Sequence, residues 1–271
     1  MIEYLVLASG IFFLLFLFPW KGRKYAAILG WAAMVLFLIA EIPFYIFSEN
    51  NILYPAIAIL SLPFLFVTSR RLLLGDKSIL ALSRGAAVAF LLFAPFAYIP
   101  PLGNWLIGVV AGEVTTFVNA MAGGATLLEW NLLGRNGFKV EIILACTGIQ
   151  SMAIMLGVAG AVPTTTRQKI LAFLLVVPTI YILNLLRNVL VIIAYTGQWF
   201  PYFPEIASNG EYGYESFFWA HNIFAEGGAL VALIAIAYGL FVLIPDLGRW
   251  AGDLYAIYSA DLAGLVRRRD T

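Results

Sequence analysis

The chain of 271 residues is 62% hydrophobic and only 11% charged, whereas soluble domains carry about 25% charged residues, so we expect an integral membrane protein. Its net charge of +1 and its short, separate basic clusters give no extended positive face, which argues against a nucleic-acid partner. One cysteine and one histidine exclude an internal disulfide and the usual zinc motifs, so we expect no metal and no other cofactor.

Seven apolar runs are long enough to cross a hydrocarbon core of about 30 Å. In chain order they are 2–20, 25–47, 52–68, 79–99, 142–162, 169–198 and 217–244. The first run has no basic segment before it and no small-residue cleavage site after it, so we interpret it as a retained span. An eighth stretch, 102–120, is broken by polar residues and either crosses the membrane, re-enters it or lies at its interface. The sequence therefore predicts an all-α, polytopic transmembrane bundle with about seven crossings and one interfacial or additional apolar helix.

Basic residues between these runs predict the orientation of the chain. If 102–120 does not cross, almost all of them lie on one side, in clusters at 21–24, 70–84, 167–169, 249 and 267–269. The positive-inside rule makes that side cytoplasmic. The acidic residues that gather on the opposite side are Glu49, Glu129, Glu205, Glu211 and Glu215. We therefore expect the N-terminus outside, the C-terminus in the cytoplasm, and segments 100–141 and 199–216 outside.

The only thiol lies in "ACTGIQSM", residues 145–152, about five residues into its apolar run. At about 1.5 Å per residue, Cys146 would lie about 7 Å below the outer boundary. On one continuous helix Gln150 would follow Cys146 on the same face, and Thr147 with Ser151 would form a polar stripe beside it. The positive end of such a helix favours the thiolate, which is the nucleophilic form. The competing interpretation is a small, buried, inert side chain, which is the more common state of a lone membrane cysteine.

A single charge interrupts the apolar run "YILNLLRNVLVIIAY" at Arg187, about 11 residues before the end of the run. A guanidinium at that depth costs at least about 2.5 kcal/mol on insertion scales and stays charged, so such residues are rare and usually functional. Asn184 and Asn188 are one turn apart and give the same helix a polar face. The alternative is an arginine that reaches outward to the interface or bonds to free helix carbonyls.

The only histidine opens the last run, in "WAHNIFAEGG", about four residues inside it. Asn222 and Glu226 lie one turn apart beside His221, and Gly227 with Gly228 would let another helix approach closely. A packing role is about as common as a functional one for a lone membrane histidine. Because of the predicted orientation, however, three runs each bring one of Cys, Arg and His to the outer half of the bilayer.

These three side chains suit acyl transfer: a thiolate attacks an acyl carbon, an imidazole moves a proton and a guanidinium binds the oxyanion or the carbonyl. The motifs "ACTGIQSM", "NLLRN" and "HN", in this order, resemble the exosortase and archaeosortase family of multispan cysteine transpeptidases. The resemblance covers about residues 80–244, and "ACTGI" is most similar to the archaeosortase A branch. It implies that Cys146 is the nucleophile, Arg187 the essential basic residue and His221 the third catalytic position. Some members have Arg at that third position, so His221 acts as a base or as a substrate contact.

The resemblance also implies what the enzyme acts on. Family substrates are exported proteins with a C-terminal sorting signal, which consists of a short motif such as Pro-Gly-Phe, a transmembrane helix and a basic cluster. The signal would be cleaved at the outer membrane face through a thioester, and a membrane lipid or water would take the new C-terminus. Seven further polar residues would bind substrate or support the site: Thr147, Gln150, Ser151, Asn184, Asn188, Asn222 and Glu226.

We find no internal repeat and interpret the chain as one membrane domain with three parts. These are amino-terminal transmembrane helices at 1–78, a catalytic transmembrane core at 79–244 and a cytoplasmic tail at 245–271. Two functions of other classes stay open. A secondary transporter would use Arg187 and His221 as an intramembrane substrate site and would not need Cys146. A scaffold protein would tolerate neutral replacements of all three residues.

Overall fold

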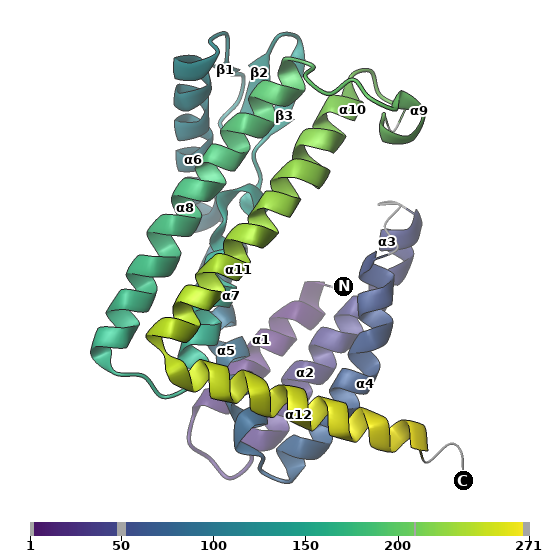
Figure 1. Ribbon diagram of the computed structural model, residues 1–271, viewed down its shortest axis with the longest axis vertical. Helices are drawn as coiled ribbons and strands as arrows, with labels where there is room; N and C mark the ends of the chain where they lie inside the picture. The colour runs from purple at the N-terminus through teal and green to yellow at the C-terminus, as the bar shows by residue number, and fades with distance from the viewer. Residues whose placement is uncertain (1–2, 48–52, 209, 268–271) are drawn as a thin grey trace. The chain divides into compact units, whose positions relative to one another are not determined.

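Helices make up most of the chain in the computed structural model, which describes residues 3–47, 53–208 and 210–267 (Figure 1). Three residues of the predicted charge clusters, Glu49, Arg268 and Arg269, lie outside these ranges. A 3-10 helix (Leu144–Thr147) precedes α7, and a π-helix (Phe218–Ala225) joins α10 to α11. The α-helices are α1 (Glu3–Leu17), α2 (Arg23–Ala40), α3 (Ile42–Phe47), α4 (Leu53–Leu73), α5 (Lys77–Tyr98), α6 (Pro100–Met121), α7 (Ile149–Ala161), α8 (Thr166–Thr196), α9 (Pro204–Ala207), α10 (Tyr214–Phe217), α11 (Glu226–Leu243) and α12 (Pro245–Arg267).

The helices confirm the predicted polytopic membrane class. Within the described ranges, five helices are long and apolar enough to cross a membrane: Arg23–Phe47, Tyr54–Leu73, Lys77–Tyr98, Thr166–Thr196 and Tyr214–Leu243. There are also two shorter apolar helices, Tyr4–Leu17 and Ile149–Ala161. Together these seven correspond to the seven predicted runs. The eighth apolar stretch forms α6, which is not one of the five.

The chain divides into two compact units. The first unit comprises Met1–Leu92, Leu156–Lys169 and Leu243–Thr271, and the second unit comprises Phe93–Met155 and Ile170–Val242. All ten predicted site residues belong to the second unit. The three parts predicted from the sequence, 1–78, 79–244 and 245–271, are defined by their expected roles and not by how the helices pack. That division stays a prediction.

In the first unit, α2 packs against both α1 and α4. The rings of Phe13 on α1 and Trp31 on α2 meet edge to face, with their centroids 5.0 Å apart. The buried Ser9 hydroxyl donates a hydrogen bond of 2.8 Å to the carbonyl of Gly30. A polar group inside an apolar core is thereby satisfied, as burial requires.

The amphipathic α12 is held on the first unit by its buried side and by ionic contacts. Leu254, Ile257 and Tyr258 pack against the apolar core of this unit. Arg71 of α4 donates two hydrogen bonds to the Asp261 carboxylate, at 2.8 and 2.6 Å. These bonds hold the pKa of the Asp261 carboxyl below its ordinary value, against the opposing effect of its partial burial.

Glycines bring α5 and α7 into close contact in the first unit. A Cβ added to Gly157 would lie 2.6 Å from the carbonyl oxygen of Gly85 and 2.8 Å from the Cβ of Ala89. Small residues at such crossings let membrane helices approach until their backbones touch, which increases van der Waals contact.

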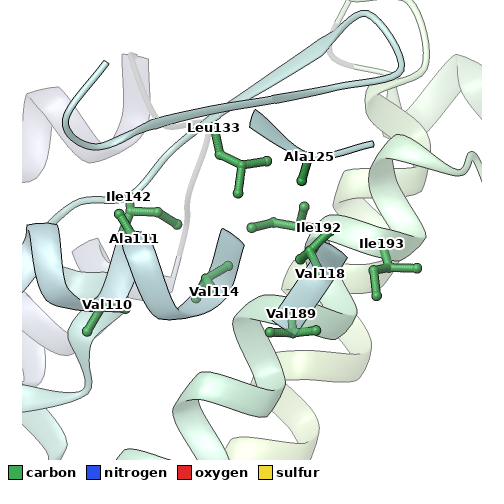
Figure 2. Close-up of a cluster of buried hydrophobic side chains, with 10 residues drawn as sticks. All are labelled: Val110, Ala111, Val114, Val118, Ala125, Leu133, Ile142, Val189, Ile192 and Ile193. Atoms are coloured by element: carbon green, nitrogen blue, oxygen red, sulfur yellow. The ribbon is translucent and has the colours of Figure 1, made fainter. Parts of the chain in front are cut away.

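The core of the second unit joins α6, α8 and a small sheet (Figure 2). Val110, Val114 and Val118 are spaced four residues apart, so they lie on one face of α6. They pack with side chains of α8, Val189 among them, and with Leu133 of the sheet. Cys146, Tyr181 and Leu185 border this cluster.

The sheet is an addition that the sequence analysis did not predict. It has three antiparallel strands in the order β1 (Thr126–Leu127), β2 (Leu132–Arg135) and β3 (Phe138–Glu141). Asn136 and Gly137 connect β2 to β3 with φ of 51° and 84°. Positive φ at both positions is the geometry of a two-residue type I′ turn, for which Asn-Gly is the favoured sequence.

The β2–β3 hairpin lies over the ends of α6 and α8 (Figure 1). Arg135 donates to the carbonyl of Gly123, just after α6, at 2.8 Å and to the hydroxyl of Thr196, the last residue of α8, at 2.6 Å. Asn136 donates to the Thr196 carbonyl at 3.1 Å. Positive and amide donors at helix C-termini satisfy carbonyls that have no partner within the helix.

Candidate active site

Cys146 lies in the 3-10 helix Leu144–Thr147, just after the sheet and before α7. The expectation that one helix begins near Glu141 and carries Cys146 is wrong, because the chain stays extended there. The backbone N–H of Ile142 donates to the Asn131 carbonyl at 2.8 Å, which prolongs the pairing beyond β3. Regular helix begins only at Ile149.

Gly148 separates the 3-10 helix from α7. Its φ of 78° lies in the left-handed region, which a residue with a side chain seldom adopts. A Cβ there would also approach the side chain of Asn184 to 3.2 Å. Because of this break, Cys146 and Gln150 do not share one helix face, so that prediction is also wrong. Gln150 is exposed on α7.

Two amide side chains of α8 hold the peptide group of Cys146. Asn184 and Asn188 donate hydrogen bonds to its carbonyl oxygen at 2.6 and 2.7 Å. Thr147 is buried and supports the same turn, because its hydroxyl donates to the Leu144 carbonyl at 2.7 Å. The main chain at the thiol is therefore held by three side chains, two of them from the helix that carries Arg187.

Arg187 bonds to the histidine of the facing helix. Its Nη2 lies 3.0 Å from Nε2 of His221. Its Nε is buried and has no hydrogen-bond partner among the described residues. Among the residues that the structure describes, no Asp or Glu forms an ion pair with Arg187. A buried guanidinium N–H without an acceptor is costly, so this donor calls for an acceptor that is not a residue of the described chain.

His221 lies in the π-helix Phe218–Ala225. Single π-turns within longer helices are rare and are frequent at functional sites. The Nδ1 atom of His221 lies 2.9 Å from Oδ1 of Asn222, and Glu226 places a carboxylate oxygen 3.9 Å from the same nitrogen. The ring of Phe217 stacks on the imidazole, with centroids 4.8 Å apart and planes inclined by 16°.

Two cavities adjoin these residues within the second unit. The smaller cavity, of about 240 Å³, is lined by Cys146 and His221 together with Asn188. The larger cavity, of about 500 Å³, is lined by Arg187, Asn184 and Ser151 and otherwise by mostly apolar side chains. The structure thus brings Cys146 and His221 to one cavity, whereas Arg187 faces the other and reaches His221 by its hydrogen bond.

Several residues around the smaller cavity were not predicted from the sequence. Lys139 and Glu141 come from β3, Tyr195 from the end of α8, and Glu211 with Tyr214 from the segment before the π-helix. The sequence signal that would have located the first two is Asn-Gly in "GRNGFKV", because it marks a hairpin. Among the described residues, no three His, Cys, Asp or Glu side chains are grouped as metal ligands would be.

Comparisons with known proteins identify the family of the chain. The family described as transmembrane exosortase (Exosortase_EpsH) matches residues 3–206, about three quarters of the chain, including Cys146 and Arg187. The chain belongs to the transmembrane exosortase family. It is also 26% identical to Archaeosortase A of Natronomonas pharaonis over 86% of this chain and 80% of that protein. Its identity to Archaeosortase A of Haloferax volcanii is 26%, over 86% of this chain and 84% of that protein. No solved structure matches.

Family membership makes this chain a membrane protein of the sorting class. Its candidate site contains groups that could carry out acyl transfer. A thiol, a proton acceptor and a cation lie within one unit, each on a different element. This set suits nucleophilic attack on a carbonyl followed by charge stabilisation.

Proposed function

We propose that the chain is a membrane-embedded cysteine transpeptidase or protease of the archaeosortase type. It recognises the C-terminal sorting signal of exported proteins and cleaves that signal at the outer membrane face through a thioester on Cys146. It then transfers the new C-terminus to a membrane lipid. The observation that carries this proposal is the shared cavity of Cys146 and His221, with Arg187 hydrogen-bonded to His221.

The larger cavity supports an intramembrane position for the substrate. Small residues of the π-helix and α11, including Ala220, Gly228 and Ala232, line one side of it. Small residues allow a second helix to approach closely within a membrane. An apolar helix of the substrate packed here would place the polar segment that precedes it near the smaller cavity, so that location and sequence would both contribute to specificity.

The proposed reaction has two acyl transfers. The Cys146 sulfur attacks the scissile carbonyl carbon, its proton leaves to a base, and the oxyanion is stabilised by Arg187. When the intermediate collapses, the C–N bond breaks, the leaving amine takes the proton and the signal departs. A lipid hydroxyl or amine then attacks the thioester and restores the thiol. Water in place of lipid would make the same site a protease.

The secondary transporter remains the alternative from another class. It would need Arg187 and His221 but not Cys146. Membership in a family of sorting enzymes supports the transpeptidase, and so does the position of the only thiol at the cavity of His221.

The test is tail removal from a reporter protein that ends in Pro-Gly-Phe, a transmembrane helix and a basic cluster. We expect Cys146→Ala to abolish removal without lowering enzyme abundance. Cys146→Ser should be nearly as inactive, because an alcohol is a far weaker nucleophile than a thiolate without strong base assistance. Ser259→Ala, on the exposed part of α12, is the control and should process normally. Normal processing by Cys146→Ala in cells without other sortases would refute the proposal.

A further inference from the structure

The two ring nitrogens of His221 face partners of opposite hydrogen-bonding character. Nε2 lies 3.0 Å from Nη2 of Arg187, on α8. Nδ1 lies 2.9 Å from the amide oxygen of Asn222 and 3.9 Å from a carboxylate oxygen of Glu226. One nitrogen therefore faces a cation, and the other faces two oxygens.

Chemistry decides which nitrogen carries the proton. A guanidinium has five N–H donors and no lone pair, so Arg187 can only donate. Nε2 must then accept, which means that it carries no proton. The imidazole is accordingly neutral, and its one proton is on Nδ1, where it is donated to Asn222. The two contacts require the same tautomer independently.

We infer that Asn222 and Arg187 together hold His221 as the neutral Nδ1–H tautomer, so that Nε2 is the basic nitrogen that takes the Cys146 proton once Arg187 has moved from it to the substrate. Asn222 is a positioning residue in this scheme, because it acts through the ring and not on the reacting atoms. The tautomer rests on hydrogen-bond geometry alone. The release of Arg187 rests in addition on the proposed function.

The stacked ring of Phe217 supports this arrangement. Its inclination of only 16° to the imidazole means that the two planes are nearly parallel. Rotation of the imidazole out of this plane would lose the contact. Phe217 therefore helps to fix the plane of the ring, and the hydrogen bonds to Arg187 and Asn222 select which nitrogen faces which residue.

The release of Arg187 follows from the single lone pair of Nε2, which cannot accept from Arg187 and take a proton from Cys146 at the same time. Arg187 therefore moves to the substrate oxygen first, where its buried Nε–H, which has no acceptor among the described residues, gains one. Nε2 then takes the Cys146 proton. The imidazolium and the guanidinium repel each other, so Arg187 stays with the oxygen as its negative charge develops. The proton on Nε2 later passes to the leaving amine, and the original pair forms again.

Other titratable groups line the smaller cavity together with His221. They come from β3, the end of α8, and the segment before the π-helix: Lys139, Glu141, Tyr195, Glu211 and Tyr214. Because these groups titrate as well, the experiment is made at one fixed pH at which the imidazole is neutral. It then measures which ring nitrogen of His221 carries the proton.

The test uses the fact that the chain has only one histidine. The full-length protein, labelled with ¹⁵N-histidine and held in nanodiscs at about pH 8.5, where an ordinary imidazole is neutral, gives the ring signals of His221 alone. We expect Nδ1–H to exceed Nε2–H by at least about tenfold. Free histidine prefers Nε2–H, so the protein must reverse the intrinsic preference. A dominant Nε2–H signal in the unmodified protein would overturn the inference.

A pair of variants separates positioning from folding. Asn222→Ala removes the acceptor and should shift the signals toward Nε2–H, whereas Asn222→Asp keeps an oxygen and should preserve Nδ1–H. Processing of the reporter should slow in Asn222→Ala with a lower kcat and an unchanged KM, and Asn222→Asp should restore it. The same ratio of Nδ1–H to Nε2–H in Asn222→Ala and Asn222→Asp would contradict the role of Asn222. Failure of the unmodified protein to process any reporter would count against the proposed function but would leave the measured tautomer intact.

Discussion

At the scale of single residues, the charge of Arg187 is the feature that most needs a functional explanation. It lies nine residues before the end of α8, about 14 Å along the helix at 1.5 Å per residue. Among the described residues its side chain hydrogen-bonds to His221, and no carboxylate pairs with it. An unpaired cation within the membrane is expensive, and a developing oxyanion would supply the missing negative charge.

The first prediction separates the charge of Arg187 from its shape. Lysine keeps the positive charge but presents a compact ammonium in place of a planar fork of donors. Losing one oxyanion donor typically lowers turnover by about 10²- to 10³-fold, or about 2.7 to 4 kcal/mol. We expect Arg187→Lys to fold and insert but to process the reporter at least ~10²-fold more slowly, with binding less affected than turnover.

The measurement is processing rate against reporter concentration in nanodiscs, with co-purification of the reporter as the binding check. Arg249→Lys, at an exposed position of α12, is the matched control and should behave as the unmodified chain. Near-normal turnover in Arg187→Lys would remove the oxyanion role. A loss confined to binding would assign Arg187 to holding the sorting signal instead.

At the scale of elements, hydropathy predicts the apolar helices well but not the local geometry around the thiol. The runs that contain Arg187 and His221 are helical, as expected, because long apolar segments must satisfy their backbone groups internally. The segment around Cys146 differs because Gly148 adopts a left-handed conformation and the strand before it keeps its pairing. A glycine at that point, after the strand-forming "FKVEI", is a weak signal by itself.

Other local features depend on contacts that single-sequence patterns do not carry. The hairpin at Asn136 and Gly137 has a clear turn signal, but its two short strands contain few apolar residues to mark them. The π-helix around His221 has no sequence signature at all. It depends on how the helix packs, so hydrophobic periodicity cannot distinguish it from an α-helix.

The second prediction concerns the attachment of α12 to α4. Asp261 has a lowered pKa, so its bond to Arg71 is fully stabilising above the ordinary carboxyl pKa of about 3.9 and is lost as the pH falls through the lowered value. We expect Asp261→Asn to lower the melting temperature in detergent by a few degrees at neutral pH, as a loss of about 1 kcal/mol would. The difference in melting temperature between Asp261→Asn and the unmodified protein should become smaller below about pH 4.

Asp253→Asn is the control for this experiment. It makes the same charge change on the same helix, but Asp253 is exposed and accepts a long hydrogen bond, of 3.3 Å, from Ser78. Its effect on the melting temperature should therefore be smaller. Equal effects of the two substitutions, or a difference for Asp261→Asn that does not change with pH, would contradict the account of α12.

At the scale of the whole molecule, charge is distributed unevenly between the two units. Of the 16 Lys and Arg residues, 13 fall in the sequence ranges of the first unit and three in the second. Of the 15 Asp and Glu residues, eight fall in the first and seven in the second. The formal charges are therefore +5 (13 minus 8) and −4 (3 minus 7), which sum to the +1 of the chain. This asymmetry supports the proposed orientation, with the basic loops in the cytoplasm.

The third prediction tests that orientation with single cysteines on a Cys146→Ala background. In intact cells an impermeant maleimide should label Glu129→Cys and Glu211→Cys, which are exposed positions near the sheet and before α10. It should label Thr166→Cys, at the start of α8, only after the membrane is opened. The reverse pattern would direct Cys146 and His221 toward the cytoplasm and would contradict cleavage at the outer face.

The most direct test of the central claim, that Cys146 is the nucleophile, is to trap its thioester. The unmodified enzyme, incubated with the reporter and quenched in acid, is measured by intact mass spectrometry. Because the chain has one cysteine, any acylated thiol is Cys146. We predict an adduct with the mass of the reporter without its signal, released by hydroxylamine and absent in Cys146→Ala. Signal removal at the normal rate with no such adduct, and with the thiol blocked by alkylation, would contradict the account.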